Sequence, residues 1–117
     1  MPYVDGFIVP VPKAKLADYK AVAEKARDVW MELGALSYVE AVADDVPVGE
    51  LTSFPRAVQL TDDEVVVFSW ITYESREARD SINQKVMADP RMKDGMENCP
   101  FDGKRLVYGG FTTFVEN

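Results

Sequence analysis

The sequence predicts an α+β fold in the ferredoxin-like order β-α-β-β-α-β, with both helices on one face of a mostly antiparallel sheet. Three observations predict it. Apolar residues recur every three or four positions over residues 13–33 and again over residues 75–88, which is typical of amphipathic helices. Extended apolar segments precede, separate and follow these helices. The chain has 117 residues, the size of one domain, so we expect residues 1–117 to form a single unit.

The first half of the chain is expected to form a strand, a long helix and a second strand. The first strand covers residues 3–11, with apolar side chains on both of its faces. Pro12 suits the start of the helix over residues 13–33, because its missing N–H would have no partner there. Gly34 follows where a left-handed C-cap is needed, and residues 35–43 form the next strand.

The middle of the chain is expected to hold the clearest strand. A loop is predicted over residues 44–54, which contain Pro47 and Gly49. Residues 56–60 are expected to form a short extension of the sheet. The strand over residues 64–73 follows, and its centre scarcely alternates between apolar and polar side chains. Both of its faces are therefore expected to be covered.

The last third is expected to form a helix, an irregular segment and a final strand. Ser75 is a good N-cap for a helix that runs to about Ala88. Pro90 ends it, because the residue before a proline avoids the helical conformation. Residues 91–101 are expected to be irregular, and residues 105–115 to form the last strand.

The apolar character of both sheet faces predicts a homodimer. Two helices cover only one face, and the exposed face of an antiparallel sheet normally alternates apolar with polar residues. A four-stranded face of roughly 400 Å² is comparable to the largest apolar patch that a soluble monomer usually shows. We therefore expect two copies to pack their helix-free faces together about a twofold axis.

Composition excludes several classes of partner. Thirteen basic and twenty acidic residues give a net charge of −7. Between Glu40 and Glu64, Arg56 is the only basic residue. Nucleic acids and anionic membrane surfaces need a basic patch, so we expect neither as a partner. No apolar run approaches the roughly 20 residues of a membrane span.

Cysteine and histidine content restricts the chemistry. Cys99 is the only cysteine, so no intrachain disulfide is possible, and without a signal-peptide pattern a reducing, cytoplasmic location is expected. Histidine is absent, which removes the usual nucleophile–histidine systems, histidine-ligated haem and typical zinc sites. We expect no metal and no cofactor. Any general base must be a carboxylate, a lysine, a tyrosine or the chain terminus.

Five blocks of sequence carry a resemblance to a known family. They are residues 3–7 (YVDGF), 44–47 (DDVP), 65–70 (VVVFSW), 87–92 (MADPRM) and 100–105 (PFDGKR). In these blocks the chain resembles the YbaA-like family of small bacterial proteins of unknown function. The blocks extend over nearly the whole chain. The resemblance implies a dimeric α+β barrel, in which two ferredoxin-like sheets face one another. It implies no catalytic residue.

Asp5 is the first candidate site residue, because it is a carboxylate inside an otherwise apolar strand. A buried carboxylate needs a cation or hydrogen-bond donors, and Arg56, Lys104 and Arg105 are the candidate partners. In the functional interpretation Asp5 is a base in a pocket and Arg105 clamps an anion. In the structural interpretation Asp5 forms a salt bridge or lies at an exposed strand end.

Trp70 and Arg56 are the other candidates. Trp70 shares strand parity with Phe68, so the two should face the same way. Together with Tyr73 and Tyr108 they would wall a flat apolar site, or else pack in a core or interface. Arg56 would bind a ligand carboxylate or simply neutralise its acidic neighbours.

Three functional hypotheses follow. The first is a homodimer that binds a small anionic or aromatic metabolite between helices and sheet, with five ligand-binding residues: Asp5, Arg56, Trp70, Lys104 and Arg105. The alternative is a cofactor-independent enzyme of monooxygenase or isomerase type, with Asp5 or a tyrosine as proton acceptor in the same pocket. The third is a structural partner protein without a cavity.

Overall fold

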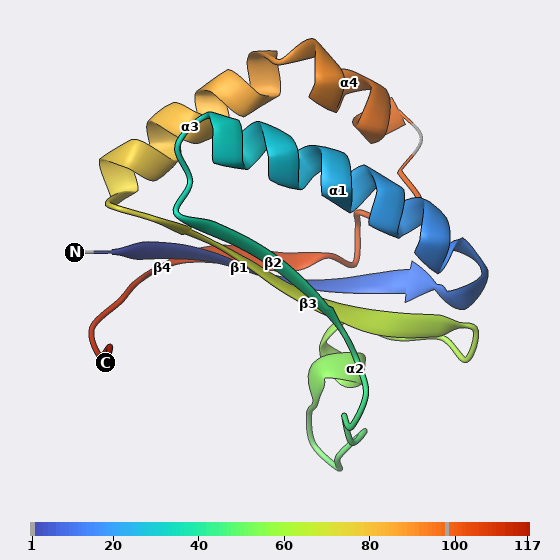
Figure 1. Cartoon of the computed structure of the whole chain (residues 1–117). Coiled ribbons are helices and arrows are strands. Elements are labelled where there is room, and N and C mark those ends of the chain that lie inside the picture. The colour runs from blue at the N-terminus through green and yellow to red at the C-terminus, as the bar shows by residue number, and fades with distance from the viewer. Residues whose placement is uncertain (1, 98) are drawn as a thin grey trace.

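The computed structural model describes residues 2–97 and 99–117 (Figure 1). Its elements follow one another as β1 (Tyr3–Pro12), η1 (Lys13–Lys15), α1 (Leu16–Glu32), β2 (Ser37–Val42), α2 (Phe54–Ala57), β3 (Glu64–Tyr73), α3 (Arg76–Ala88), α4 (Pro90–Glu97) and β4 (Val107–Thr112). None of the helices in the described part of the chain combines the length and the apolar character needed to cross a membrane.

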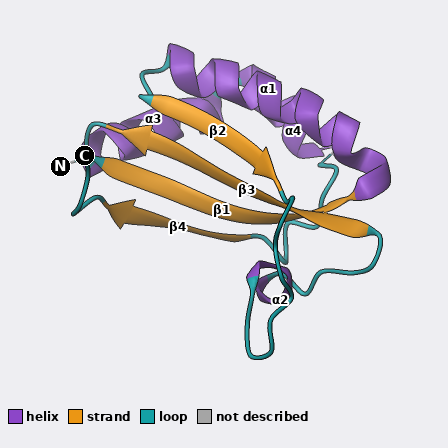
Figure 2. Ribbon diagram, turned by 60° about the horizontal axis from the view of Figure 1, so that its bottom comes forward, coloured by secondary structure: helices purple, strands orange, loops and turns teal. Residues whose placement is uncertain are grey.

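The four strands form one sheet in the order β2-β3-β1-β4, and every neighbouring pair is antiparallel. Helices α1, α3 and α4 lie together over one face of this sheet, whereas α2 lies on the other side (Figures 1 and 2). The α+β class and the antiparallel sheet expected from the sequence are therefore confirmed.

Strand register determines which side chains face the helices. The odd-numbered residues of β1 and β3 point toward α1 and α3, and the register aligns Val9 with Val67. A slip of one residue would turn every one of these side chains to the opposite face. The buried members form two clusters: Tyr3, Val29, Ala35, Ile71, Tyr73, Ile82 and Val86 in one, and Val9, Val11, Tyr19, Ala23 and Val67 in the other.

The ends of the long helices follow the local signals. Pro12 leads into the single turn η1 before α1 begins, and Gly34 adopts a φ of 115° after the helix ends. Ser75 caps α3 by accepting a hydrogen bond from the backbone N–H of Ala78 at 3.1 Å. These three predicted boundaries are confirmed to within a few residues.

The predictions for two segments were wrong. Residues 56–60 do not extend the sheet: α2 forms there, because Ser53 caps it by accepting from the backbone N–H of Arg56 and Pro55 lies in its first turn. Residues 91–97, expected to be irregular, belong to α4, which begins at Pro90. A proline that ends one helix is also well suited to begin the next.

The face that α1, α3 and α4 leave uncovered, called here the helix-free face although the short α2 lies at one end of it, comprises the even-numbered residues of β1 and β3 and the residues of β2 and β4 that pair with them. Phe68 and Trp70 lie side by side on it with ring centroids 5.5 Å apart, which confirms their predicted parity. The segment around α2 covers one end, where Pro10 and Val58 are fully buried. The chain itself therefore covers that end of the face, which two packed copies were expected to cover. Phe68 and Phe111 remain 42% and 62% exposed.

Candidate functional site

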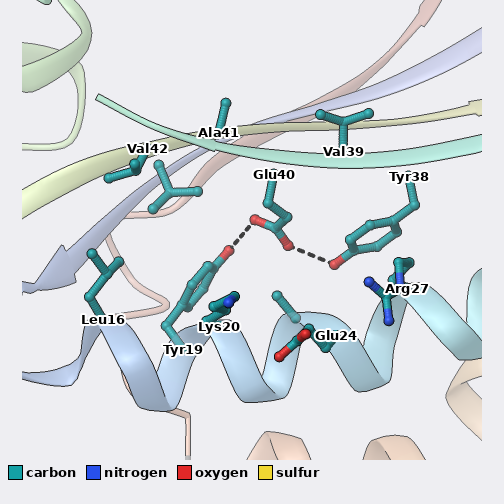
Figure 3. Close-up of a pocket in the computed structure, with 12 residues that line it drawn as sticks. Leu16, Tyr19, Lys20, Glu24, Arg27, Tyr38, Val39, Glu40, Ala41 and Val42 are labelled. Atoms are coloured by element: carbon teal, nitrogen blue, oxygen red, sulfur yellow. Dashed lines mark hydrogen bonds between the residues drawn. The ribbon is translucent and has the colours of Figure 1, made fainter. Parts of the chain in front are cut away.

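A cavity of about 510 Å³ opens between α1 and the edge strand β2 (Figure 3). Its size falls within the usual range of small-molecule sites. It lies between helix and sheet, where the sequence led us to expect a pocket. The lining residues are Leu16, Tyr19, Lys20, Ala23, Glu24, Arg27, Tyr38, Val39, Glu40, Ala41, Val42 and Val67.

The polar centre of this cavity is the carboxylate of Glu40. The Tyr19 hydroxyl donates a hydrogen bond to one of its oxygens at 2.6 Å, and the Tyr38 hydroxyl donates to the other at 2.6 Å (Figure 3). Tyr38 and Glu40 are two residues apart on β2, so both point to the helix side of the sheet. Tyr19 reaches them from the buried side of α1.

Both tyrosines are hydrogen-bond donors at neutral pH. Burial raises the pKa of the Tyr19 hydroxyl well above its ordinary value, and the negative charge of Glu40 and the hydrogen bond to it raise this pKa further. The same causes, in the same order, raise the pKa of Tyr38. A phenol with a raised pKa keeps its proton, so neither hydroxyl is suited to accept a proton from a substrate.

The mouth of the cavity carries charges of both signs. Lys20, Glu24 and Arg27 project from successive turns of α1 (Figure 3). Arg27 pairs with its neighbour Asp28 at 3.1 Å. Within the described residues no ion pair reaches Glu40. The carboxylate is thus hydrogen-bonded, and no cation of the described part of the chain forms an ion pair with it.

Asp5 lies elsewhere on the same face, and its predicted partners were wrong. The Nε of Arg79 in α3 donates to its carboxylate at 3.0 Å, and the buried Tyr73 hydroxyl donates at 3.0 Å. Arg79 also lies over the ring of Tyr3, 5.0 Å from its centroid. Burial and the charge of Asp5 raise the pKa of Tyr73. Asp5 is buried and does not line the cavity between α1 and β2.

Arg105 joins two segments of the chain on the helix-free side of the sheet. Its guanidinium pairs with the buried Glu64 carboxylate at 2.5 and 2.8 Å and also donates to the carbonyl oxygens of Val58 and Gln59 at 3.2 and 3.0 Å. The hydrogen bonds from Arg105 outweigh the effect of burial and lower the pKa of Glu64 from 4.5 to about 2. Arg105 thereby ties the segment after α2 to the start of β3.

The remaining predicted residues lie apart from one another. Arg56 is exposed and donates to the carbonyl oxygens of Val48 and Gly49, both at 2.9 Å. Lys104 is exposed in the turn before β4, where its backbone N–H donates to Asp102 at 2.9 Å. Trp70 pairs across the sheet with Gly6 and lies on the helix-free face, the face opposite to Asp5.

The structure does not bring the five predicted residues into one site. Sequence reasoning missed the three residues that do converge, Tyr19, Tyr38 and Glu40. A signal for two of them was present, because Tyr38 and Glu40 alternate with aliphatic residues along the second strand. No group of three or more acidic or sulfur side chains with metal-binding geometry is found among the described residues.

The chain is similar to known proteins in structure and in sequence. A structure of Rv0793 from Mycobacterium tuberculosis matches with a TM-score of 0.63 and 14% identity, covering 99% of this chain and 98% of that one, which supports the fold alone. Uncharacterized protein YbaA of Escherichia coli K12 is 53% identical over 116 residues, with 99% of both chains covered, and the YbaA of Shigella flexneri matches equally well. These matches confirm the resemblance seen in the sequence.

A family model described as "Protein of unknown function (DUF1428)" matches residues 2–103. This span contains β1 to β3 and all the helices, and with them the Glu40 cavity. Together with the 53% identity to YbaA over almost the full length, it shows that the chain belongs to this YbaA-like family of unknown function.

Proposed function

We propose that this protein binds a small organic molecule, without covalent chemistry, in the cavity between α1 and β2. The observation that carries the proposal is the Glu40 carboxylate, which two tyrosine hydroxyls hold in place at 2.6 Å inside a cavity of about 510 Å³. Sites of this kind combine apolar walls with a few fixed polar groups that orient the ligand. The walls here are the side chains of Leu16, Ala23, Val42 and Val67.

The arrangement is hard to explain by packing alone. A carboxylate near apolar side chains costs free energy unless it is well hydrogen-bonded or paired, and a hydrophobic residue at position 40 would avoid that cost. Two O–H donors keep the Glu40 carboxylate in a single orientation. Fixed polar groups reduce the entropy that a ligand loses on binding, which supports a role for Glu40 in recognition.

The enzyme alternative draws no support from these residues. Asp5, its first candidate base, already accepts hydrogen bonds from Arg79 and Tyr73 and lies away from the cavity. The two cavity tyrosines keep their protons at neutral pH because their pKa values are raised. Binding therefore stands as the first proposal.

Native mass spectrometry of protein purified from its own cells, followed by a thermal-shift screen of a metabolite library, tests this proposal. We expect one molecule bound per chain. Backbone amide NMR shifts should then change in residues 16–27 and 38–42, which line the cavity, and not in residues 53–60 around α2. A protein that binds nothing from the cell extract or the library, or that binds only near α2, would contradict it.

We also propose that two copies pair through their helix-free faces, as in a dimeric α+β barrel. The strand order β2-β3-β1-β4 is consistent with the ferredoxin-like order that such barrels use. Phe68, Val107 and Phe111 remain 42%, 41% and 62% exposed on this face. Exposed apolar side chains gathered on one sheet face favour association with a second copy. The single cysteine favours a reducing, cytoplasmic setting for this dimer.

Two substitutions in the same strand test the pairing. Phe111 lies on the helix-free face of β4, whereas Tyr108, 72% exposed, lies on the face that carries the helices. We expect light scattering to find a dimer for the unmodified protein and for Tyr108→Glu at micromolar concentration. Phe111→Glu should weaken dimerisation by about a hundredfold or more, because it places two carboxylates in an apolar interface. An unmodified protein that is monomeric would overturn the pairing.

A further inference from the structure

We infer that the cavity between α1 and β2 selects small organic cations, with Glu40 accepting N–H hydrogen bonds from a protonated amine or amidine of the ligand. This inference rests on the proposed binding function and names its ligand class. The sequence suggested an anionic or aromatic metabolite. The anionic alternative is reversed here, because Arg56 and Arg105 donate to acceptors of the chain itself and the carboxylate of Glu40 lies at the centre of the cavity.

The first support is the charge balance at Glu40. A carboxylate offers about four acceptor sites, and the two tyrosines use one on each oxygen. Tyrosine hydroxyls donate hydrogen bonds but bring no positive charge. The two buried carboxylates on the strands, Asp5 and Glu64, each have an arginine, at 3.0 and 2.5 Å, whereas Glu40 is half-buried. Among the described residues Glu40 has no such partner, so a cationic ligand would supply the positive charge that an arginine gives to the other two carboxylates.

The second support is the distribution of charge around the cavity. Glu24 lies between Lys20 and Arg27 on α1, and Arg27 is paired with Asp28, so the mouth has little net positive charge to attract an anion. The whole chain carries a net charge of −7. An acidic protein draws cations toward its clefts and repels anions, which adds to the local preference.

The third support is the shape of the polar centre. Two tyrosine rings stand on either side of the Glu40 carboxylate in Figure 3. Aromatic rings beside a carboxylate suit ammonium groups, because ring faces attract cations as well. The aliphatic side chains of Leu16, Ala23 and Val42 offer contact to the hydrocarbon part of the ligand. A compact aliphatic or aromatic amine fits this combination.

Three probes that share a 2-phenylethyl group and differ in the charge of the group it carries test the inference: 2-phenylethylammonium, 2-phenylethanol and 3-phenylpropanoate. Each is titrated at pH 7 while backbone amide NMR shifts are followed. We expect the ammonium to bind at least about tenfold more tightly than the alcohol, and the carboxylate to bind most weakly. Glu40→Gln, which keeps the size of the side chain, should abolish the preference. Glu77→Gln, an exposed carboxylate in the first turn of α3 that does not line the cavity, is the matched control and should keep it.

The outcomes separate this inference from the proposed function. Equal affinity of the three probes at the cavity, or tightest binding of the carboxylate, would overturn the cation preference while leaving ligand binding intact. A preference for the ammonium that survives in Glu40→Gln would also overturn it. If no probe binds, the cation inference fails, and the proposed function is decided independently by the screen of cell-derived ligands. Retained NMR dispersion in each variant shows that the fold is unchanged.

Discussion

Two carboxylates, Asp5 and Glu40, lie on the same face of the sheet under the helices, and they differ in the side chains that bind them. Asp5 on β1 accepts from Arg79 and Tyr73 and is closed off from solvent. Glu40 on β2 accepts from two tyrosines and borders a cavity. Both are held by hydrogen bonds, but among the residues that the structure describes an ion pair reaches Asp5 and none reaches Glu40. A carboxylate that the fold neutralises itself serves stability, whereas one that it only orients remains available to a ligand.

The backbone reinforces the difference. Asp5 pairs across the sheet with Gly110, and the Tyr3 hydroxyl and the Arg79 guanidinium occupy the space that a side chain at Gly110 would need. The Asp5 region is therefore closed by atoms of the chain itself. Glu40 lies on an edge strand, with a neighbouring strand on one side only, so its surroundings are open to solvent there. Substitutions in the closed region should change stability, and substitutions in the open one should change binding.

The largest expected effect comes from removing the cation of the closed region. Arg79→Met keeps the aliphatic stem but leaves the buried Asp5 carboxylate without its charge partner. We expect the free energy of unfolding to fall by about 3 kcal/mol in urea denaturation, because breaking a buried pair leaves an uncompensated charge. Arg76→Met is the matched control, since Arg76 on the same helix makes only an exposed contact with Asp80 at 3.8 Å. Its effect should stay within about 0.5 kcal/mol. Equal losses in both variants would remove the distinction between the two regions.

A second substitution tests how tightly the closed region is packed. Gly110→Ala would place a Cβ 2.8 Å from the Tyr3 ring and closer still to the Arg79 guanidinium, so one of them must move. We expect a loss of about 2 kcal/mol in thermal or urea unfolding. Gly109→Ala, in the adjacent position on the opposite face, meets only the Phe111 ring at 3.6 Å and should change stability little. A tolerated alanine at position 110 would show that the region is looser than described.

Local sequence patterns were enough to predict most of the fold. The strand over residues 64–73 and the cap at Ser75 depend on side chains within a few positions, and the structure confirms both. The predictions failed at residues 56–60 and 91–97, where short helices form. A single helical turn such as α2 is too short to show the apolar period of a helix. Pro90 is compatible both with the end of α3 and with the start of α4, so the local pattern does not show whether a second helix follows.

The candidate site was predicted far less well, because its contacts join distant parts of the chain. Asp5 was singled out as a carboxylate in an apolar strand, and a salt bridge was one of the interpretations left open, but its partner Arg79 is 74 positions away on a helix. Which helical side chain reaches β1 depends on how α3 packs on the sheet, and no local pattern contains that information. Tyr19 and Glu40 are 21 positions apart and meet only once α1 lies over β2. Strand parity alone placed Trp70 correctly beside Phe68, since that relation is local.

The smallest effect concerns the second neutralised carboxylate, Glu64, and extends the comparison to the helix-free side. Arg105 lowers the pKa of Glu64 in the folded state to about 2, below its ordinary value of 4.5. A group whose pKa is lowered by folding contributes stability above its unfolded pKa, and that contribution is lost as pH falls from about 4.5 toward 2. The unmodified protein should therefore lose stability over this interval relative to Glu64→Gln, which cannot titrate.

We expect the difference in unfolding free energy between the two proteins to shrink by about 1 kcal/mol from pH 6 to pH 2.5. This is less than the full pKa difference would imply, because the Arg105 side chain remains partly in contact with solvent. Asp62→Asn, which removes one negative charge at an exposed position two residues earlier, is the control for the loss of charge near the start of β3. If Glu64→Gln shows the same pH dependence as the unmodified protein, Arg105 does not neutralise Glu64 in solution. The contrast with Glu40 would then rest on Asp5 alone, because only Asp5 would still show the effect of a charge partner supplied by the chain.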